Sequence, residues 1–323
     1  MRLLVTGGCG FVGNNFIRYV LNHYQPEMIT SVDALIHPGS IESSAAFSSE
    51  FGDRYEFYRA DIADPDRMDE VLCNHSYFAV VNFAAETDLD GSVTVEDFIH
   101  TNVVGVSTLL EAARRHGVKR FVQVSTVEVY GTLPTPGRIT EQSALNPSSP
   151  YSVTKAAGDL LALAAYKNHG QDVVLTRCSN NYGPFQYPEK PIPSMILCAL
   201  LDRSMPNYED ELNTRDWIHV EDHCAAVFDV LMRGRAGEIY NVSTDAEPKT
   251  MQVLRSALLR LGKGGNLVEP ASDRPACNRR YTIDSSKLRN EIGWKPLYGF
   301  ERGLLETIDW YRQNEWWRGA KEP

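Results

Sequence analysis

Apolar and polar positions alternate in two different rhythms along the first half of the chain. Short apolar runs, typical of strands, lie at 2–6, 28–32, 55–59, 78–83, 119–125 and 172–177. Between them, apolar positions with helical spacing predict helices at 11–24, 65–73, 95–116 and 151–169. The run at 78–83 is apolar on both faces, as expected in a sheet that helices cover on both sides. This order predicts βαβ units and a parallel sheet.

The pattern changes after about residue 178, where several prolines interrupt it. Shorter elements follow, with helices predicted at 193–203, 220–233, 250–262 and 300–313 and a strand at 238–242. We therefore predict an α/β fold with two parts. Residues 1–178 form a doubly wound parallel sheet that binds a cofactor. Residues 179–323 form a smaller α/β substrate lobe, from which some of the chain crosses back to the sheet.

A glycine-rich loop follows the first predicted strand and opens the first helix. Backbone N–H groups in such a loop, together with the positive end of the helix dipole, favour a pyrophosphate. The spacing is G-x-x-G-x-x-G, and its place between a strand and a helix is what makes the motif specific. The sequence therefore predicts a Rossmann-type dinucleotide site with contacts from Gly7, Gly10, Phe11, Val12 and Gly13.

Further cofactor contacts are predicted at the ends of the next strands. Asp33 ends the second strand, 20 residues beyond Gly13. A carboxylate there accepts hydrogen bonds from the ribose hydroxyls of NAD and repels the 2′-phosphate of NADP, so we expect NAD. Asp61 and Ile62, after the third strand, are expected to hold the adenine edge, and Ala84 is expected to line the same site.

Composition narrows the classes of protein. With 32 Lys and Arg against 42 Asp and Glu, the formal net charge is −10. Such a surface repels phosphate backbones and anionic lipid, so we expect no nucleic-acid and no membrane partner. No window approaches 18 consecutive apolar residues, and the first strand leaves no room for a signal peptide, so we expect a cytoplasmic protein. The six cysteines show no zinc-site spacing, so no metal is expected.

A tyrosine and a lysine stand four residues apart near the start of the helix predicted at 151–169. Tyr151 and Lys155 therefore share one helix face. A free tyrosine is a poor base at neutral pH, but a neighbouring ammonium favours the phenolate and lowers the phenol pKa. We expect Lys155 to act on Tyr151 in this way and to reach the nicotinamide ribose. Ser125 and Thr126 end the preceding strand and offer a hydroxyl to the reacting oxygen of a substrate.

A long ordered series of segments resembles one enzyme family over nearly the whole chain. The segments are Thr6-Gly-Gly-Cys-Gly-Phe-Val-Gly13, Asn82-Phe-Ala-Ala-Glu86, Thr101-Asn-Val-Val-Gly105, Val124-Ser-Thr-Val-Glu-Val-Tyr-Gly131, Ser149-Pro-Tyr-Ser-Val-Thr-Lys155, Thr176-Arg-Cys-Ser-Asn-Asn-Tyr-Gly-Pro184, Tyr187-Pro-Glu-Lys190, Arg215-Asp-Trp217 and Arg279-Arg-Tyr281. With them, the chain resembles the extended short-chain dehydrogenase/reductases and, more narrowly, the dTDP-glucose 4,6-dehydratases.

The resemblance implies a reaction on a nucleotide-diphosphate sugar. In it, NAD oxidises the C4 hydroxyl of the sugar with Tyr151 as base, and Thr126 polarises the C4 oxygen. The ketone acidifies the C5 proton, which Glu128 removes. Water then leaves from C6, and the hydride returns there, so no external reductant is consumed. Relatives commonly form homodimers through the helices that match 95–116 and 151–169, and a homodimer is expected here.

The resemblance also implies a set of substrate contacts, some of which depart from the family pattern. The expected contacts are Asp88, Val127, Asn180, Lys190, Arg215, Asn241, Arg274 and Cys277. Val127 stands where the family has the aspartic acid that protonates the leaving hydroxyl, and valine has no proton to give. A family histidine is replaced by Asp88, an arginine by Gly91, and a phosphate-contacting histidine by Cys277. The cofactor half is therefore intact while the sugar half is rebuilt.

These departures leave several functions open. Dehydration with a proton from water agrees with Glu128, since simple C4 epimerisation needs no C5 base. A C4 epimerase needs only Tyr151 and Lys155, and a C5 epimerase needs Glu128 alone. A decarboxylase of a sugar acid needs a cation near the C6 carboxylate, and none is evident beside Val127. An NAD-bound pseudoenzyme with a binding or regulatory role is the alternative from another class.

Overall fold

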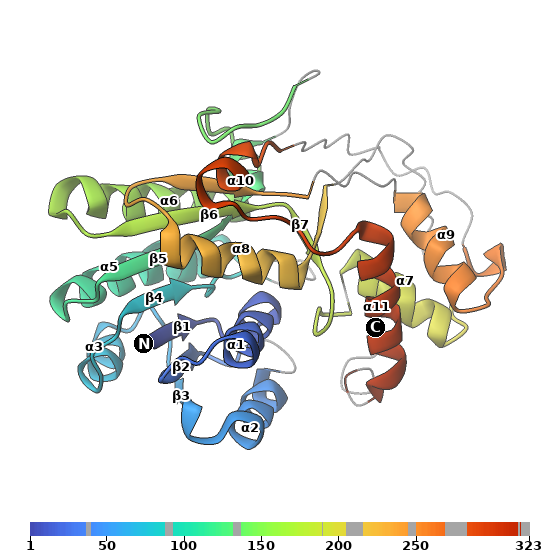
Figure 1. Ribbon diagram of the computed structural model, residues 1–323, viewed down its shortest axis with the longest axis horizontal. Coiled ribbons are helices and arrows are strands. Elements are labelled where there is room, and N and C mark those ends of the chain that lie inside the picture. Colours follow the sequence, from blue (N-terminus) through green and yellow to red (C-terminus); the bar gives the residue numbers. More distant parts are fainter. Residues whose placement is uncertain are drawn as a thin grey trace.

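The computed structural model describes residues 1–36, 40–87, 93–131, 137–188, 190–204, 216–244, 250–268, 283–315 and 317. Within these residues the chain builds a parallel sheet of seven strands in the order β3-β2-β1-β4-β5-β6-β9 (Figure 1). The strands are β1 (Arg2–Thr6), β2 (Met28–Asp33), β3 (Tyr55–Arg59), β4 (Ala79–Asn82), β5 (Arg120–Thr126), β6 (Val173–Cys178) and β9 (Ile239–Val242). The order reverses between β1 and β4, and ligands of doubly wound sheets bind at such a switch point.

Helices cover both faces of the sheet (Figure 1). One face carries α1 (Phe11–His23), α2 (Ser40–Phe51), α8 (Val220–Arg233) and α10 (Ser286–Ile292). The other face carries α3 (Pro65–Cys73), α5 (Val106–Arg115) and α6 (Pro150–His169). Leu3 and Val5 of β1 pack into the first layer and Leu4 into the second, and all three are fully buried. This two-sided burial is the reason that the strands read as continuous apolar runs.

The C-terminal part of the chain adds a smaller lobe beside the sheet, on the right of Figure 1. It contains α7 (Pro191–Leu200), α9 (Thr250–Arg260), α11 (Phe300–Gln313), and the two-stranded pair β7 (Asn180–Tyr182) and β8 (Trp217–His219). These elements share a separate apolar cluster that includes Tyr182, Ile196, Trp217 and Ile308. α8 and β9 return to the main sheet between parts of this lobe. Among the described helices, none is both long and apolar enough to cross a bilayer.

The strands and helices predicted for the first half are confirmed, with one helix more complex than expected. The helix predicted at 95–116 consists of α4 (Val95–Ile99), a π-helical turn (His100–Gly105) and α5. A Cβ at Gly105 would lie 2.7 Å from Cδ1 of Ile62, so glycine lets this turn approach the loop after β3. Sequence patterns did not predict α2, α10 or the short strands β7 and β8.

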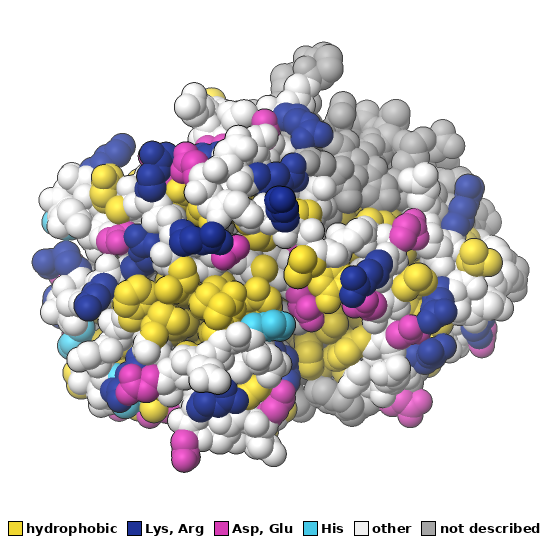
Figure 2. Space-filling view, in the orientation of Figure 1, with side chains coloured by type: hydrophobic (Ala, Val, Ile, Leu, Met, Phe, Trp, Pro, Cys, Tyr) yellow, Lys and Arg dark blue, Asp and Glu magenta, His cyan; other side chains and the backbone are white. Residues whose placement is uncertain are grey.

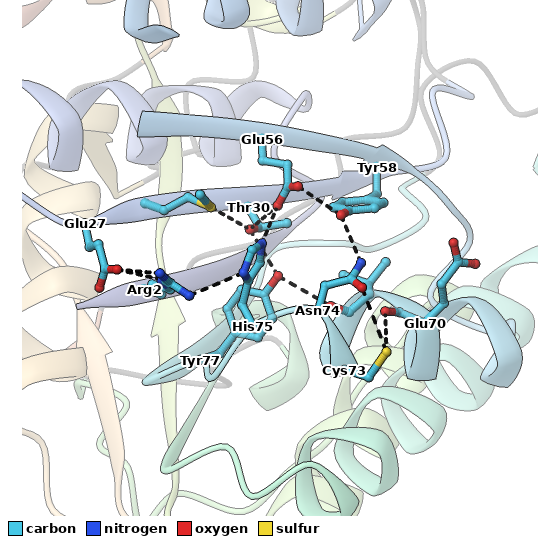
Figure 3. A network of polar contacts seen from close by, with 12 residues as sticks. Arg2, Glu27, Thr30, Glu56, Tyr58, Glu70, Cys73, Asn74, His75 and Tyr77 are labelled. Carbon is cyan, nitrogen blue, oxygen red and sulfur yellow. Dashed lines mark hydrogen bonds and ion pairs between the residues drawn. The ribbon is translucent and has the colours of Figure 1, made fainter. Parts of the chain in front are cut away.

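The amino-terminal edge of the sheet carries a closed network of polar side chains (Figure 3). Glu56 of β3 accepts hydrogen bonds from the hydroxyls of Thr30, at 3.2 Å, and Tyr58, at 2.9 Å. The same carboxylate lies 3.0 Å from Nε2 of His75, whose Nδ1 lies 3.3 Å from the guanidinium of Arg2. Because a guanidinium only donates, Nδ1 of His75 accepts and Nε2 carries the hydrogen. Both ring nitrogens are therefore paired within the protein.

Candidate active site

The glycine loop lies at the switch point, between β1 and the first turn of α1. Gly7 has φ 67°, and a Cβ there would lie 2.6 Å from the backbone nitrogen of Ala84. Gly10 is the N-cap of α1 and offers no side-chain cap, so backbone N–H groups of the first turn stay available to an anion. A loop pressed against β4, with a bare helix N-terminus, fits a dinucleotide pyrophosphate.

Asp33 stands at the end of β2 with its carboxylate fixed by the backbone. Oδ2 accepts from the N–H of Cys9 and Oδ1 from the N–H of Leu35, both at 2.9 Å. Asp33 lines a cavity together with Asp61, whose Oδ2 lies 2.8 Å from Nε2 of His100. Gly7, Gly10, Ile62 and Ala84 line this same cavity. The structure therefore brings these predicted cofactor contacts together on the side where an adenosine is expected.

A second cavity lies on the other side of the glycine loop, at the carboxyl ends of β5 and β6. Both cavities share the lining residues Gly7, Gly10, Phe83 and Ala85, so they form one continuous cleft. The remaining loop residues that were predicted, Phe11, Val12 and Gly13, line the second cavity. The cleft thus follows the carboxyl edge of the sheet past the loop, as an extended dinucleotide requires.

The four residues expected to act on substrate all line the second cavity. Thr126 ends β5, Glu128 lies in the short 3₁₀ turn Val127–Tyr130, and Tyr151 and Lys155 lie in the first turns of α6. The Thr126 hydroxyl accepts from the N–H of Glu128 at 3.3 Å. Nζ of Lys155 donates to the carbonyl oxygen of Val124 at 2.8 Å. Residues from three separate elements therefore meet at one place.

The electrostatics of this group differ from the expectation. We predicted that Lys155 lowers the pKa of Tyr151, but the pKa of the phenol is raised, mainly by burial and then by the negative charge of Glu128. A hydrogen bond with Thr126 opposes this. Burial also lowers the pKa of Lys155 to about 8, and the charge of Asp159 opposes that shift. Desolvation is the largest cause of both pKa shifts.

The start of α6 is held in place by local caps and by one asparagine. Ser149 and Ser152 form a capping box. Oδ1 of Asn102, from the π-helical turn, accepts from the N–H of Glu86 at 2.8 Å. Nδ2 of Asn102 donates at 3.1 Å to both the carbonyl oxygen of Glu86 and the hydroxyl of Thr154. Asn102 therefore fixes the start of α6 against the loop that follows β4.

A buried ion pair lies behind Lys155. Asp159 follows Lys155 by one turn of α6 and contacts Nε of Arg177, on β6, at 2.8 Å. Both side chains are almost fully buried. The guanidinium of Arg177 lies 4.8 Å from the centroid of the Tyr130 ring. The negative charge of Asp159 opposes the lowering of the Lys155 pKa by burial.

Comparison with known proteins identifies the family. The family model described as GDP-mannose 4,6 dehydratase matches residues 4–307. The chain belongs to this family. It is 44% identical to a dTDP-glucose 4,6-dehydratase of Streptomyces niveus, over 100% of this chain and 96% of that protein. The chain is thus a homologue of sugar-nucleotide 4,6-dehydratases.

Solved structures of the family carry the cofactor that the cleft predicts. A dTDP-glucose 4,6-dehydratase from Bacillus anthracis, solved with NAD, is 42% identical, with a TM-score of 0.91 over 99% of this chain and 100% of that one. The enzyme from Streptomyces venezuelae, with NAD bound, is 39% identical, with a TM-score of 0.92 over the same shares. NAD is therefore bound in close structural homologues of this dehydratase-family member.

On the substrate side, the structure brings only some of the predicted residues into the cleft. Asn180 and Lys190 line the second cavity. Val127 does not; it is 3% exposed and packs in an apolar cluster with Ile139 and Ala156. Asn241 is fully buried away from both cavities, and its Oδ1 accepts from the hydroxyl of Tyr130 at 2.9 Å. Neighbours from other elements enclose both side chains, and substrate contacts of Val127 and Asn241 stay a prediction.

The remaining predicted contacts, Asp88, Arg215, Arg274 and Cys277, lie outside the described residues, as does Gly91. Conversely, the second cavity contains residues that sequence reasoning assigned no role, among them Phe83, Ala85, Cys178, Asn181, Gln186 and His223. Phe83, Ala85, Cys178 and Asn181 fall inside segments that resemble the family, which was a usable signal. His223 lies in the first turn of α8, where nothing in the local pattern distinguishes it from a core residue.

Proposed function

We propose that the protein is an NAD-dependent 4,6-dehydratase of a nucleotide-diphosphate hexose, with dTDP-glucose as the first substrate to test. The observation that carries this proposal is the single cavity that joins the glycine loop to Tyr151, Lys155, Thr126 and Glu128. The identity of 44% to a dTDP-glucose 4,6-dehydratase over the whole chain supports it.

In this proposal, Tyr151 takes the proton from the C4 hydroxyl while bound NAD accepts the hydride and later returns it to C6. Burial and Glu128 raise the pKa of Tyr151, so the phenol needs a nearby positive charge before it can lose its proton. Lys155 lies one helical turn away, and its pKa of about 8 leaves it mostly charged at neutral pH. Lys155 therefore acts both on the phenolate and on the nicotinamide ribose.

Thr126 and Glu128 act on the sugar itself. The Thr126 hydroxyl polarises the C4 oxygen, and the carboxylate of Glu128 removes the proton that the C4 ketone has acidified at C5. The leaving C6 hydroxyl also needs a proton. Val127 supplies none and packs outside the cavity, so we propose that water delivers this proton. Loss of a positioned acid lowers a rate by about 10²–10⁴-fold, so we expect a slow dehydratase.

The test is incubation of the purified protein with dTDP-glucose in heavy water, followed by mass spectrometry of the product. Dehydration predicts that the sugar loses the mass of one water and takes up deuterium from the solvent at C5. Glu128→Gln should abolish both changes while NAD binding persists. An unchanged sugar without deuterium, from a protein that binds NAD, would contradict dehydration of this substrate.

One observation favours a second candidate, a C4 epimerase. The absence of an acid at Val127 matters little to an enzyme that oxidises and reduces the same carbon with Tyr151 and Lys155. Its product from dTDP-glucose has unchanged mass and an inverted C4, which nuclear magnetic resonance distinguishes. Deuterium at C5 without loss of water would instead indicate a C5 epimerase, and NAD binding without turnover of any nucleotide sugar would indicate a pseudoenzyme.

We also propose that the protein forms a homodimer through α4, the π-helical turn and α6. Large apolar side chains on these helices are unusually exposed for a single chain: Val95 is 51%, Ile99 45%, Val104 45%, Val153 50% and Leu160 55% exposed. Burial of such a surface against a second copy removes apolar area from water.

Sedimentation velocity tests this assembly. The unchanged protein should sediment as a dimer, and Leu160→Glu should shift it towards the monomer. Leu259→Glu is the matched control, because Leu259 is 83% exposed on α9 and should leave the dimer intact. A monomeric unchanged protein at micromolar concentration would rule the homodimer out.

A further inference from the structure

His223, on α8, forms part of the wall of the second cavity but has no place in the chemistry proposed above. Its side chain is almost fully buried, at 2% exposure. Nδ1 lies 3.0 Å from Oδ1 of Asn181. Nε2 is buried and has no hydrogen-bond partner among the described residues. A buried polar atom without a partner is costly, so it requires an explanation.

The neighbours of His223 determine which nitrogen carries the hydrogen. Nδ2 of Asn181 donates to the carbonyl oxygen of Ser179 at 3.1 Å and to Sγ of Cys178 at 3.5 Å. A carbonyl oxygen cannot donate, so the amide nitrogen of Asn181 must face it, and Oδ1 must face His223. Nδ1 of His223 is therefore the donor. Nε2 is left with a lone pair, as an acceptor only.

The charge state agrees with this tautomer. Burial lowers the pKa of His223 to about 3, so the ring is neutral at physiological pH. A neutral ring with its hydrogen on Nδ1 cannot bind a phosphate oxygen through Nε2, because both atoms are acceptors. The group that Nε2 suits is a hydrogen-bond donor.

The position of His223 indicates which part of a ligand meets it. Sγ of the adjacent Cys224 lies 3.9 Å from the carbonyl oxygen of Val12, so this part of α8 packs behind the glycine loop. His223 shares the cavity with Val12 and with Cys178, at the end of β6. The wall formed by His223 is therefore close to the cofactor loop.

We propose that Nε2 of His223 accepts a hydrogen bond from the carboxamide NH₂ of the nicotinamide and so is a recognition residue for NAD. This inference rests on the proposed NAD-dependent function. In the nicotinamide half of NAD, the donors are the carboxamide NH₂ and the ribose hydroxyls. Lys155 is assigned to the ribose, so the carboxamide is the donor left for the lone pair of Nε2.

The test compares binding of NAD with binding of 3-acetylpyridine adenine dinucleotide, in which a methyl group replaces the NH₂ and the carbonyl is kept. Dissociation constants come from isothermal titration calorimetry of the full-length protein freed of bound nucleotide. The unchanged protein should prefer NAD by about tenfold or more, because the analogue leaves Nε2 unpaired. His223→Leu should bring this preference close to one.

Two further variants keep the test decisive. His223→Gln offers Oε1 near the position of Nε2 and should restore much of the preference. His219→Gln is the matched control. His219 is also buried and is the N-cap of α8, but it lines neither cavity, so the preference should not change. Equal preference in His223→Leu and the unchanged protein would overturn the inference and leave a buried water as the partner of Nε2. Failure of the unchanged protein to bind NAD would instead overturn the proposed cofactor.

Discussion

Each edge of the parallel sheet carries a histidine, and the two histidines differ in their hydrogen bonding. At the amino-terminal edge, both nitrogens of His75 are paired, one with Arg2 and one with Glu56 (Figure 3). At the carboxyl edge, His223 uses one nitrogen, and the other has no partner among the described residues. His75 thus has both nitrogens paired within the protein, whereas Nε2 of His223 is left for a ligand to pair, as proposed above.

Charged side chains of both signs are spread over the face of the molecule that Figure 2 presents. An apolar area is visible on this face beside α8 (Figure 2). Substitutions at the two edges should have separable effects on activity and on stability.

The largest separation is expected for Tyr151→Phe at the carboxyl edge. Loss of the hydroxyl removes the proposed base, so kcat should fall by about 10²–10⁴-fold. The free energy of unfolding in urea should change by less than about 1 kcal/mol. Tyr130→Phe is the control, because the Tyr130 hydroxyl bonds to Asn241 outside the cleft and should affect stability rather than kcat. Equal loss of kcat in both variants would contradict the assignment.

Glu56→Leu should produce the reverse result at the amino-terminal edge. The substitution leaves the hydroxyls of Thr30 and Tyr58 and Nε2 of His75 without their acceptor. We expect the free energy of unfolding to fall by about 2 kcal/mol, measured by urea titration, with kcat per folded molecule unchanged. An exposed ion pair is the control: Glu306→Gln, opposite Arg302, should cost less than about 1 kcal/mol. A large loss of kcat in Glu56→Leu would show that the edges are coupled.

The smallest effect is a pH dependence of stability that belongs to His223. Its folded pKa of about 3 lies below the unfolded value near 6.5, so between these values the unfolded state binds more protons. Its contribution is complete above pH 6.5 and is lost as the pH falls towards 3. At pH 5.5 the loss is about 1 kcal/mol, and His223→Gln should remove it.

Two neighbours on α8 and its cap also titrate in this range, so the comparison must be between variants. His219 has a pKa lowered to about 4 and adds a loss of the same sign, whereas Asp222 has a pKa raised to about 6 and opposes it. Both remain in His223→Gln and cancel in the difference. Unfolding in urea at pH 5.5 and pH 7.5 measures this difference. If the free energy of unfolding of His223→Gln changes between these pH values by as much as that of the unchanged protein, a buried, neutral His223 is contradicted.

Much of the fold and of the cofactor site was predictable because the relevant contacts are local. The glycine loop needs only contiguous backbone after a strand, and Tyr151 and Lys155 share a helix face through their spacing alone. The short strands β7 and β8 were not predictable, since they exist only by pairing Asn180 with Trp217 across a long stretch of sequence.

The failures at the site have the same physical origin. The sequence predicted substrate contacts for Val127 and Asn241, but it could not show that side chains distant in sequence enclose both residues. The pKa of Tyr151 was misjudged because spacing along a helix reveals the lysine but not the depth of burial. His223 was missed because an unpaired nitrogen is a property of the assembled structure.

The amide bridge made by Asn102 has a consequence for how such a protein can change over time. Asn102 forms hydrogen bonds with the N–H and the carbonyl oxygen of Glu86 and with the hydroxyl of Thr154. Glu86 lies just before the segment of the sequence that carries Asp88 and Gly91. If, as proposed, this segment recognises the sugar, specificity can change there while the hydrogen bonds that join Asn102 to Glu86 and Thr154 are kept, which separates the evolution of specificity from that of redox chemistry.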